Sequence, residues 1–203
     1  MRVLDLFSGL GGFSEAFVIA GDEVERVENN PLLSEVPHTT LMDVFELRDN
    51  LASYMENGYP CRPIDVIVAS PPCLEFSTAY NAPRSKAQRS GEEWNPSMEL
   101  VEATLDIIKL IKPRYWVIEN VSGSQRYFNQ IGLEVNQIHG ACVFYGNFPK
   151  FSTPPMPSKK SKDTTSSDPL RMNKRALIPI ELSRALRKAI LSQKTLLDDY
   201  NIA

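Results

Sequence analysis

The sequence has few of the residues that build disulfide frameworks or metal sites. Its 203 residues include three cysteines and two histidines. None of the cysteines forms a CxxC pair, and His38 lies far along the chain from His139. A structural zinc site needs four such ligands at short spacings, and a disulfide framework needs an even set of cysteines. We therefore expect no bound metal and reduced thiols, which leaves room for a reactive one.

The sequence also lacks a membrane segment and a secretory signal. No stretch approaches the roughly 20 consecutive apolar residues that span a bilayer. Asp5 and a glycine-rich run interrupt the apolar N-terminus, and no basic segment precedes them, unlike in a signal peptide. We therefore expect an intracellular protein with no membrane partner.

Charge is unevenly distributed along the chain. The net charge of −3 argues against a generic nucleic-acid-binding protein. However, residues 150–188 carry 10 Lys/Arg and 3 Asp/Glu, whereas residues 1–149 carry 11 and 20. A basic segment on an acidic body suits contact with phosphates. A solvated tail has the same composition, and charge alone favours that simpler interpretation.

Short apolar segments alternate with amphipathic ones. Strands are predicted at residues 2–7, 24–27, 65–69 and 115–118, and helices at residues 13–19, 46–56 and from 95 to before 113. Asn95 and Pro96 suit the N-cap and first turn of that last helix. Residues 74–94 show no periodicity and predict a long loop. The alternation predicts an α/β fold with a doubly wound, mostly parallel sheet and helices on both faces.

The chain is long enough for one domain, which we place at residues 1–203. Residues 152–175 are rich in Ser, Thr, Pro and Lys and predict a flexible basic loop or linker. Residues 176–197 predict a C-terminal helix that packs back on the domain through apolar positions such as Leu182 and Leu186.

A glycine-rich turn, DLFSGLGGF from Asp5 to Phe13, follows the first strand. Glycines there let the backbone approach a ligand closely. The spacing fits neither the dinucleotide fingerprint nor a P-loop. Glu28, at the end of the next strand, is placed to accept hydrogen bonds from a ribose, and Asp43 to meet an adenine amino group. A nucleoside cofactor without a pyrophosphate suits this set, although a tight turn with two surface carboxylates fits equally well.

Two further motifs lie at strand ends, where a parallel sheet binds its ligands. The prolines of Ser70-Pro71-Pro72-Cys73 stiffen the chain and direct the Cys73 thiol into the crevice above the sheet. A thiolate there is a nucleophile, whereas a small buried hydrophobe is the usual role of a free cysteine. Glu119, in Glu119-Asn120-Val121, is placed to hydrogen-bond a bound base, or else caps a turn.

The order of these motifs resembles the cytosine-5 DNA methyltransferase family. DLFSGLGGF is similar to its cofactor motif nearly letter for letter. SPPC, followed by Phe76-Ser77, is similar to its catalytic Pro-Cys motif, and residues 119–121 are similar to its ENV motif. The resemblance covers residues 1–121 well and the remainder poorly. It implies a Rossmann-like methyltransferase fold, S-adenosylmethionine as cofactor and methylation of cytosine carbon 5, in DNA first and RNA second, in the cytoplasm of a prokaryotic or viral host cell.

The resemblance also implies roles for individual residues. Cys73 would attack ring carbon 6 of a cytosine taken out of its stack, and Glu119 would hydrogen-bond its ring nitrogen and amine. The implied cofactor-binding residues are Asp5, Phe7, Ser8, Gly9, Gly11, Gly12, Glu28, Asn29, Asp43 and Pro71. The implied nucleic-acid-binding residues are Ser77, Arg84, Lys86 and Arg89, in a loop that closes over the substrate.

The chain departs from the family pattern in four respects. Leu74 follows Cys73 where the family usually has Gln. No Gln-x-Arg-x-Arg motif follows Glu119, and the late Gly-Asn-Ser-Val motif is absent. The 152–175 segment is too short for a target-recognition domain. We therefore keep three alternatives: DNA methylation with little sequence reading or with a partner subunit that supplies recognition, methylation of a tRNA-like RNA, and a non-catalytic S-adenosylmethionine-binding partner subunit. Restriction–modification, viral and housekeeping roles all suit this sequence.

Overall fold

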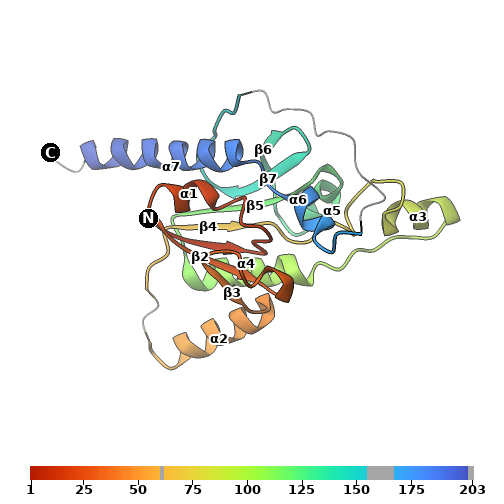
Figure 1. Cartoon of the computed structure of the whole chain (residues 1–203), viewed down its shortest axis with the longest axis horizontal. Helices are drawn as coiled ribbons and strands as arrows, with labels where there is room; N and C mark the ends of the chain where they lie inside the picture. The colour runs from red at the N-terminus through yellow and green to blue at the C-terminus, as the bar shows by residue number, and fades with distance from the viewer. Residues whose placement is uncertain (60–61, 155–166, 201–203) are drawn as a thin grey trace.

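Seven strands form one sheet in the order β3-β2-β1-β4-β5-β7-β6 in the computed structural model (Figure 1). The structure describes residues 1–59, 62–154 and 167–200, and their side chains as far as residue 193. The strands are β1 (Arg2–Leu6), β2 (Glu23–Glu28), β3 (Thr39–Leu41), β4 (Val66–Ala69), β5 (Tyr115–Val121), β6 (Val135–His139) and β7 (Cys142–Asn147). Strands β1 to β5 pair in parallel, and β7 runs antiparallel to both β5 and β6. The predicted doubly wound, mostly parallel sheet is confirmed.

Helices cover both faces of the sheet, as predicted (Figure 1). The helices are α1 (Glu15–Ile19), α2 (Val44–Glu56), α3 (Pro83–Ser90), α4 (Glu99–Ile111), α5 (Gln125–Gln130), α6 (Arg171–Ala176) and α7 (Ile180–Tyr200), with 3-10 turns η1 (Pro31–Leu33) and η2 (Ser122–Ser124). On one face, α1 and α7 bury Phe17, Leu182 and Leu186 against the strands. On the other, α2, α4 and α5 form a second core that includes Ile107 and Phe128. No helix in the described part of the chain is long and apolar enough to cross a membrane.

The segment predicted as a loop at residues 74–94 contains helix α3, so this prediction was wrong. Pro83 occupies the first turn, and Gly91 ends the helix in the left-handed conformation, with φ of 76°. Both are ordinary start and stop residues. The helix escapes prediction because it has no apolar stripe: Ala87 is its one buried residue. We call residues 76–93, with α3 at their centre, the arm.

Helix α4 begins at Glu99 and not at Asn95, so the predicted N-cap was wrong. The reason is a competing set of hydrogen bonds. The Trp94 indole N–H donates to the Glu75 backbone carbonyl at 2.9 Å, and the Ser97 backbone N–H donates to the Glu75 carboxylate at 2.6 Å. These bonds hold the residues before α4 outside the helix.

Strand β5 extends three residues beyond the predicted end, through Glu119, Asn120 and Val121, because β7 pairs with it as far as Cys142. The last helix also differs from the prediction, since α7 begins at Ile180. Of the predicted linker, residues 155–166 lie outside the described residues, and α6 occupies 171–176.

Candidate cofactor and catalytic site

The glycine turn after β1 is held in place by the neighbouring strand β2. The Gly9 backbone N–H donates to the Glu28 carboxylate at 2.8 Å, and the Ser8 N–H donates to the Val27 carbonyl at 3.1 Å. Phe7 has a φ of 57°, in the left-handed region that bulky residues avoid. Such strain persists where the surrounding structure imposes it, often at a ligand site. The turn therefore has a fixed shape with an outlying backbone geometry at its start.

Glu28 has both carboxylate oxygens engaged with the backbone. One accepts from Gly9, and the other accepts from the Asn30 N–H at 2.9 Å. The residue is only 9% exposed. Each carboxylate oxygen has a second lone pair, so it can accept a further hydrogen bond from a hydroxyl group. The geometry is thus compatible with ribose binding, which stays a prediction.

A small hollow brings together four of the predicted cofactor residues. It is lined by Phe7, Val27, Glu28, Asn29, Met42, Asp43 and Val44. Asp43 caps the start of α2, since its Oδ1 accepts from the Phe45 N–H at 2.8 Å, and its Oδ2 accepts from the Asn29 amide at 3.3 Å. Because the hollow is small, an adenosine would require exposed side chains such as Asn29 to move outward.

The three glycines of the turn differ in what surrounds them. A Cβ on Gly11 would lie 2.3 Å from the Arg26 guanidinium carbon, and one on Gly12 would lie 2.5 Å from the Ile178 carbonyl. A Cβ on Gly9 would meet only the Asn173 amide, at 3.9 Å. Gly11 and Gly12 therefore admit close packing of the protein itself. Gly9 is the one beside which space remains for a ligand.

Asp5 differs from its predicted role of direct cofactor contact. Its side chain is fully buried beneath the turn, and neither carboxylate oxygen has a hydrogen-bond partner. Burial raises the pKa of Asp5 to about 7, while Ser14 and the charge of Arg26 oppose this rise less strongly. A side chain so enclosed lies under the turn and does not line the hollow.

Two buried hydroxyl groups mark the ends of the central strands. The Oγ atoms of Ser8, after β1, and Ser70, after β4, are buried without a hydrogen-bond partner. These strands are neighbours, and the Ser70 N–H donates to the Leu6 carbonyl at 3.1 Å. Unsatisfied polar groups are costly in a protein interior. Neither serine lines the hollow beside Phe7, so both hydroxyl oxygens lie below the surface, as the Asp5 carboxyl does.

A hydrogen bond joins the two predicted catalytic motifs. The Asn120 side-chain amide donates to the Pro71 carbonyl at 3.0 Å, and both residues are buried. Pro71 lies two residues before Cys73, and Asn120 directly follows Glu119. The bond therefore holds the start of the Cys73 loop against the end of β5. Both Cys73 and Glu119 are half-buried.

Tyr145 is a site neighbour that sequence reasoning missed. Its hydroxyl lies 2.9 Å from the Ser124 hydroxyl, which in turn donates to the Val121 carbonyl at 2.8 Å. Burial raises the pKa of Tyr145, and the charge of Glu119 raises it further. Tyr145 thus stays protonated and braces the turn that follows Glu119. Tyr145 lies in β7, whose sequence has no pattern of polar residues that would indicate this role.

Arg84 holds the arm and does not point freely toward a substrate, unlike its predicted role. Its Nη1 donates to the Gly123 carbonyl at 3.0 Å and to the Phe76 carbonyl at 3.4 Å. Its guanidinium also lies 5.6 Å from the centre of the Tyr127 ring. These contacts connect α3 to the turn after β5.

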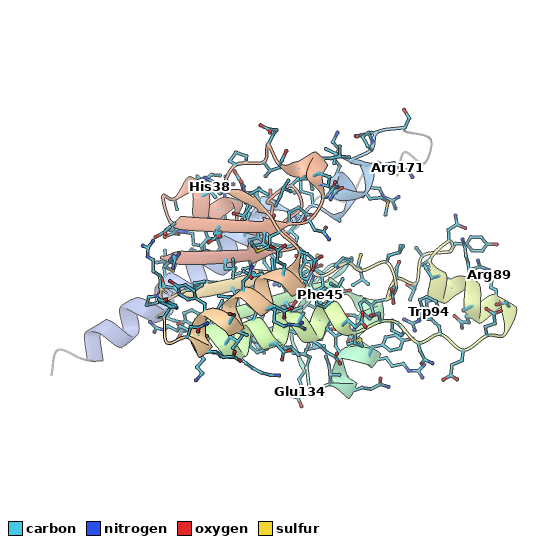
Figure 2. The ribbon with its side chains drawn as sticks, turned by 90° about the horizontal axis from the view of Figure 1, so that it is seen from below. His38, Phe45, Arg89, Trp94, Glu134 and Arg171 are labelled. Atoms are coloured by element: carbon cyan, nitrogen blue, oxygen red, sulfur yellow. The ribbon has the colours of Figure 1, made fainter. Side chains whose placement is uncertain are left out.

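The other three predicted nucleic-acid contacts lie in the arm. Lys86 and Arg89 are exposed on α3, and the Ser77 hydroxyl accepts from the Ala79 N–H at 3.2 Å. The Arg89 guanidinium stacks 4.0 Å from the centre of the Tyr80 ring, which is 74% exposed. Figure 2 shows α3, with Arg89, extending from the body at the end of the molecule where Arg171 of α6 also lies.

We expect Arg84→Met to loosen the arm. The variant removes two charge-assisted hydrogen bonds, each worth about 1.5–3 kcal/mol in general, so amide hydrogen exchange in α3 should accelerate at least tenfold. Arg89→Met is the matched control, because Arg89 touches only Tyr80 within the arm. Hydrogen-exchange mass spectrometry of residues 76–93 measures both variants. Equal exchange in the two would show that Arg84 does not anchor the arm.

Comparison with known proteins agrees with these motifs. Residues 1–138 match the model of the family described as C-5 cytosine-specific DNA methylase. The type II methyltransferase M1.HphI of Haemophilus parahaemolyticus is 31% identical over 127 residues, which are 60% of this chain and 32% of that protein. The tRNA (cytosine(38)-C(5))-methyltransferase of Homo sapiens is 28% identical over 133 residues, which are 61% of this chain and 31% of that protein.

Solved structures give a more distant similarity. The crystal structure of the S. pombe Dnmt2 methyltransferase is 18% identical and covers 72% of this chain and 48% of its own, with a TM-score of 0.38. The chain spans about a third of the length of the curated relatives just named, at 32% and 31%.

Proposed function

Because the chain belongs to the C-5 cytosine-specific DNA methylase family, we propose that it transfers a methyl group from S-adenosylmethionine to carbon 5 of cytosine in DNA, with Cys73 as the nucleophile. The Asn120–Pro71 hydrogen bond is the observation that carries this proposal, because it joins the Cys73 loop to the strand end that bears Glu119. The glycine turn lies at the neighbouring strand end, since β1 pairs with β4. Nucleophile, base-binding carboxyl and cofactor turn thus share one edge of the sheet.

The chain's own residues perform the following steps. The Cys73 thiolate adds to carbon 6 of a cytosine that has left its stack. Glu119 hydrogen-bonds the ring nitrogen and the exocyclic amine, so that the electron pair from the ring double bond is available at carbon 5. S-adenosylmethionine, when bound, would supply an electrophilic methyl group at that carbon and leave as S-adenosylhomocysteine. Loss of the carbon 5 proton then restores the double bond and releases Cys73.

The proposed cofactor site consists of the glycine turn and the hollow beside it. Gly9 leaves space beside the turn, and Glu28 retains lone pairs for a ribose. Asp43 and Asn29 line the hollow where an adenine would lie. These residues fit a nucleoside cofactor with a short polar extension.

The arm favours a second candidate substrate, an unpaired cytosine in RNA or single-stranded DNA. The exposed Tyr80 ring carries a cation on one face, which suits stacking with a nucleobase. Base–aromatic stacking of this kind is typical of single-strand and loop recognition. One relative is a tRNA methyltransferase by name. The choice between duplex DNA and an unpaired strand is therefore the main question about the substrate.

The proposal is tested by transfer of labelled methyl from S-adenosylmethionine to duplex DNA, single-stranded DNA and bulk tRNA in parallel. Each substrate is also prepared with 5-fluorocytosine, in which fluorine replaces the proton that must leave, so Cys73 should stay covalently attached. We expect methyl transfer and a covalent adduct on one substrate class, and we expect that class to be duplex DNA. No transfer and no adduct, with cofactor binding intact, would favour a partner-dependent or non-catalytic protein.

A further inference from the structure

Arg26, in the middle of β2, is almost fully buried, which is rare for a charged residue unless its charge is paired. Its side chain is 1% exposed, and it is the largest of the fully buried side chains in the described part of the chain. Withdrawing a guanidinium from water costs several kcal/mol in general, which only well-formed hydrogen bonds offset. Its partners therefore indicate what it does.

The guanidinium of Arg26 connects β2 to the glycine turn and to the helix that follows it. Its Nη2 donates to the Gly11 carbonyl at 2.9 Å, and its Nε donates to the Ser14 hydroxyl at 2.9 Å. The remaining contacts are a 2.7 Å ion pair with Glu15 and a 3.0 Å bond from Nη1 to the Pro37 carbonyl. Three of the four bonded residues thus belong to the segment 11–15.

Arg26 and Glu28 act on opposite ends of the same turn. They lie two residues apart on β2, so their side chains leave the same face of the sheet. Glu28 accepts the Gly9 N–H, and Arg26 donates to the Gly11 carbonyl. Gly11 has a φ of 79°, and a Cβ there would lie 2.3 Å from the guanidinium. The turn and the arginine are therefore fitted to each other.

We propose that Arg26 is a positioning residue that sets the shape of the glycine turn and thereby the affinity for the cofactor. This inference rests on the proposed function where it names the cofactor as S-adenosylmethionine. Arg26 does not line the hollow beside Phe7, so it acts through the turn alone. Loss of its bonds to Gly11 and Ser14 lets the turn relax, so that the space beside Gly9 and the position of Glu28 relative to it are no longer fixed.

The test separates this role from a general contribution to stability. Arg26→Gln removes the charge and the fork of donors, while Arg26→Lys keeps the charge with a single donor group. Ile107→Ala, which opens a cavity in the core under α4 and leaves every hydrogen bond of Arg26 in place, serves as a control for loss of stability alone. Calorimetric titration with S-adenosylmethionine is carried out at a temperature where all the variants are folded, as shown by their thermal melts.

We expect Arg26→Gln to raise the Kd for S-adenosylmethionine at least tenfold, Arg26→Lys to raise it less, and Ile107→Ala to leave it within twofold. In turnover, Arg26→Lys should raise the KM for the cofactor and leave kcat nearly unchanged. An equal Kd for Arg26→Gln and Ile107→Ala would overturn the proposal.

Amide exchange of residues 9–14 gives a second readout that needs no ligand. It should accelerate at least tenfold in both arginine variants and not in Ile107→Ala. Wild-type protein that binds no S-adenosylmethionine would contradict the proposed function, while the exchange measurement would still decide whether Arg26 holds the turn. Unchanged exchange in the arginine variants would refute that role by itself.

Discussion

Replacement of Cys73 by serine is expected to lower methyl transfer at least a thousandfold, while the Kd for S-adenosylmethionine changes by less than about twofold. A serine hydroxyl stays protonated at neutral pH and is a far weaker nucleophile than a thiolate. Losses of this order are common when a covalent nucleophile is removed. The cofactor turn lies on a different strand end, and the Pro71 carbonyl that Asn120 holds is a backbone group, so the substitution leaves both in place.

Cys142→Ser is the matched control for this prediction. Cys142 is the other cysteine in the described part of the chain and is also half-buried, but it lies in β7 opposite Val121. Radiolabel transfer and calorimetry, carried out on both variants, measure turnover and cofactor affinity separately. A parallel loss of turnover and cofactor binding in Cys73→Ser would assign Cys73 a structural role.

The second large effect concerns stability. The raised pKa of Asp5, about 7 against 3.8 for the ordinary carboxyl, means that the folded chain favours the protonated form. The free energy of unfolding contributed by this group is therefore highest below the unfolded pKa. It falls as pH rises from about 4 to about 7, by a few kcal/mol in total at about 1.4 kcal/mol per pKa unit.

Asp5→Asn should abolish this loss. The amide has nearly the same shape and carries no charge, and its oxygen is an acceptor that can keep the contact with Ser14. We expect its Tm to exceed that of the wild type by roughly 9–18 °C at pH 8, given about 4.5 kcal/mol and about 2–4 °C per kcal/mol for a chain of this length. Below pH 4 the variant and the wild type should have the same Tm. Melting curves that keep a constant separation from pH 4 to pH 8 would contradict the assignment.

Four of the strands and the helices α1, α2, α4 and α7 were predictable because they carry a clear local pattern, whereas β6, β7, α5 and α6 were not predicted. The apolar runs of β1 and β4 end at glycine and proline, and α4 has a continuous apolar stripe. Helix α3 was not predictable by the same route, since it lies outside the core and depends on Arg84 for its attachment. The extension of β5 depends on pairing with β7, which no local pattern reveals.

The candidate site was predictable as a set of motifs but not as a set of contacts. Residues at strand ends converge because parallel strands share a carboxyl edge, and this alone brings Glu28 and Asp43 to one hollow. The role of Arg26 was hidden because the β2 sequence EVERVE suggests alternate exposure of its charges, whereas Arg26 and Glu28 are both buried. Burial of a charge depends on partners from distant segments, here Gly11 and Pro37.

The structure describes only part of the basic segment at residues 150–188. Its described part includes α6, where Lys174 pairs with Asp168 at 2.6 Å, so part of its charge is used within the protein. Residues 155–166 lie outside the described residues. The proposed contact of this segment with phosphates therefore stays a prediction.

The attachment of the arm has a thermodynamic consequence for substrate binding. A loop that orders only on binding loses roughly 1–2 kcal/mol of backbone entropy per residue at that moment. Here Arg84 fixes α3 to the turn after β5, and Trp94 and Ser97 fix the far end to Glu75, before any substrate arrives. That entropy is lost when the chain folds, so the proposed contacts of Tyr80 and Arg89 with a substrate would contribute to affinity almost undiminished. The arm is thus a preorganised surface, and its rigidity is part of its binding strength.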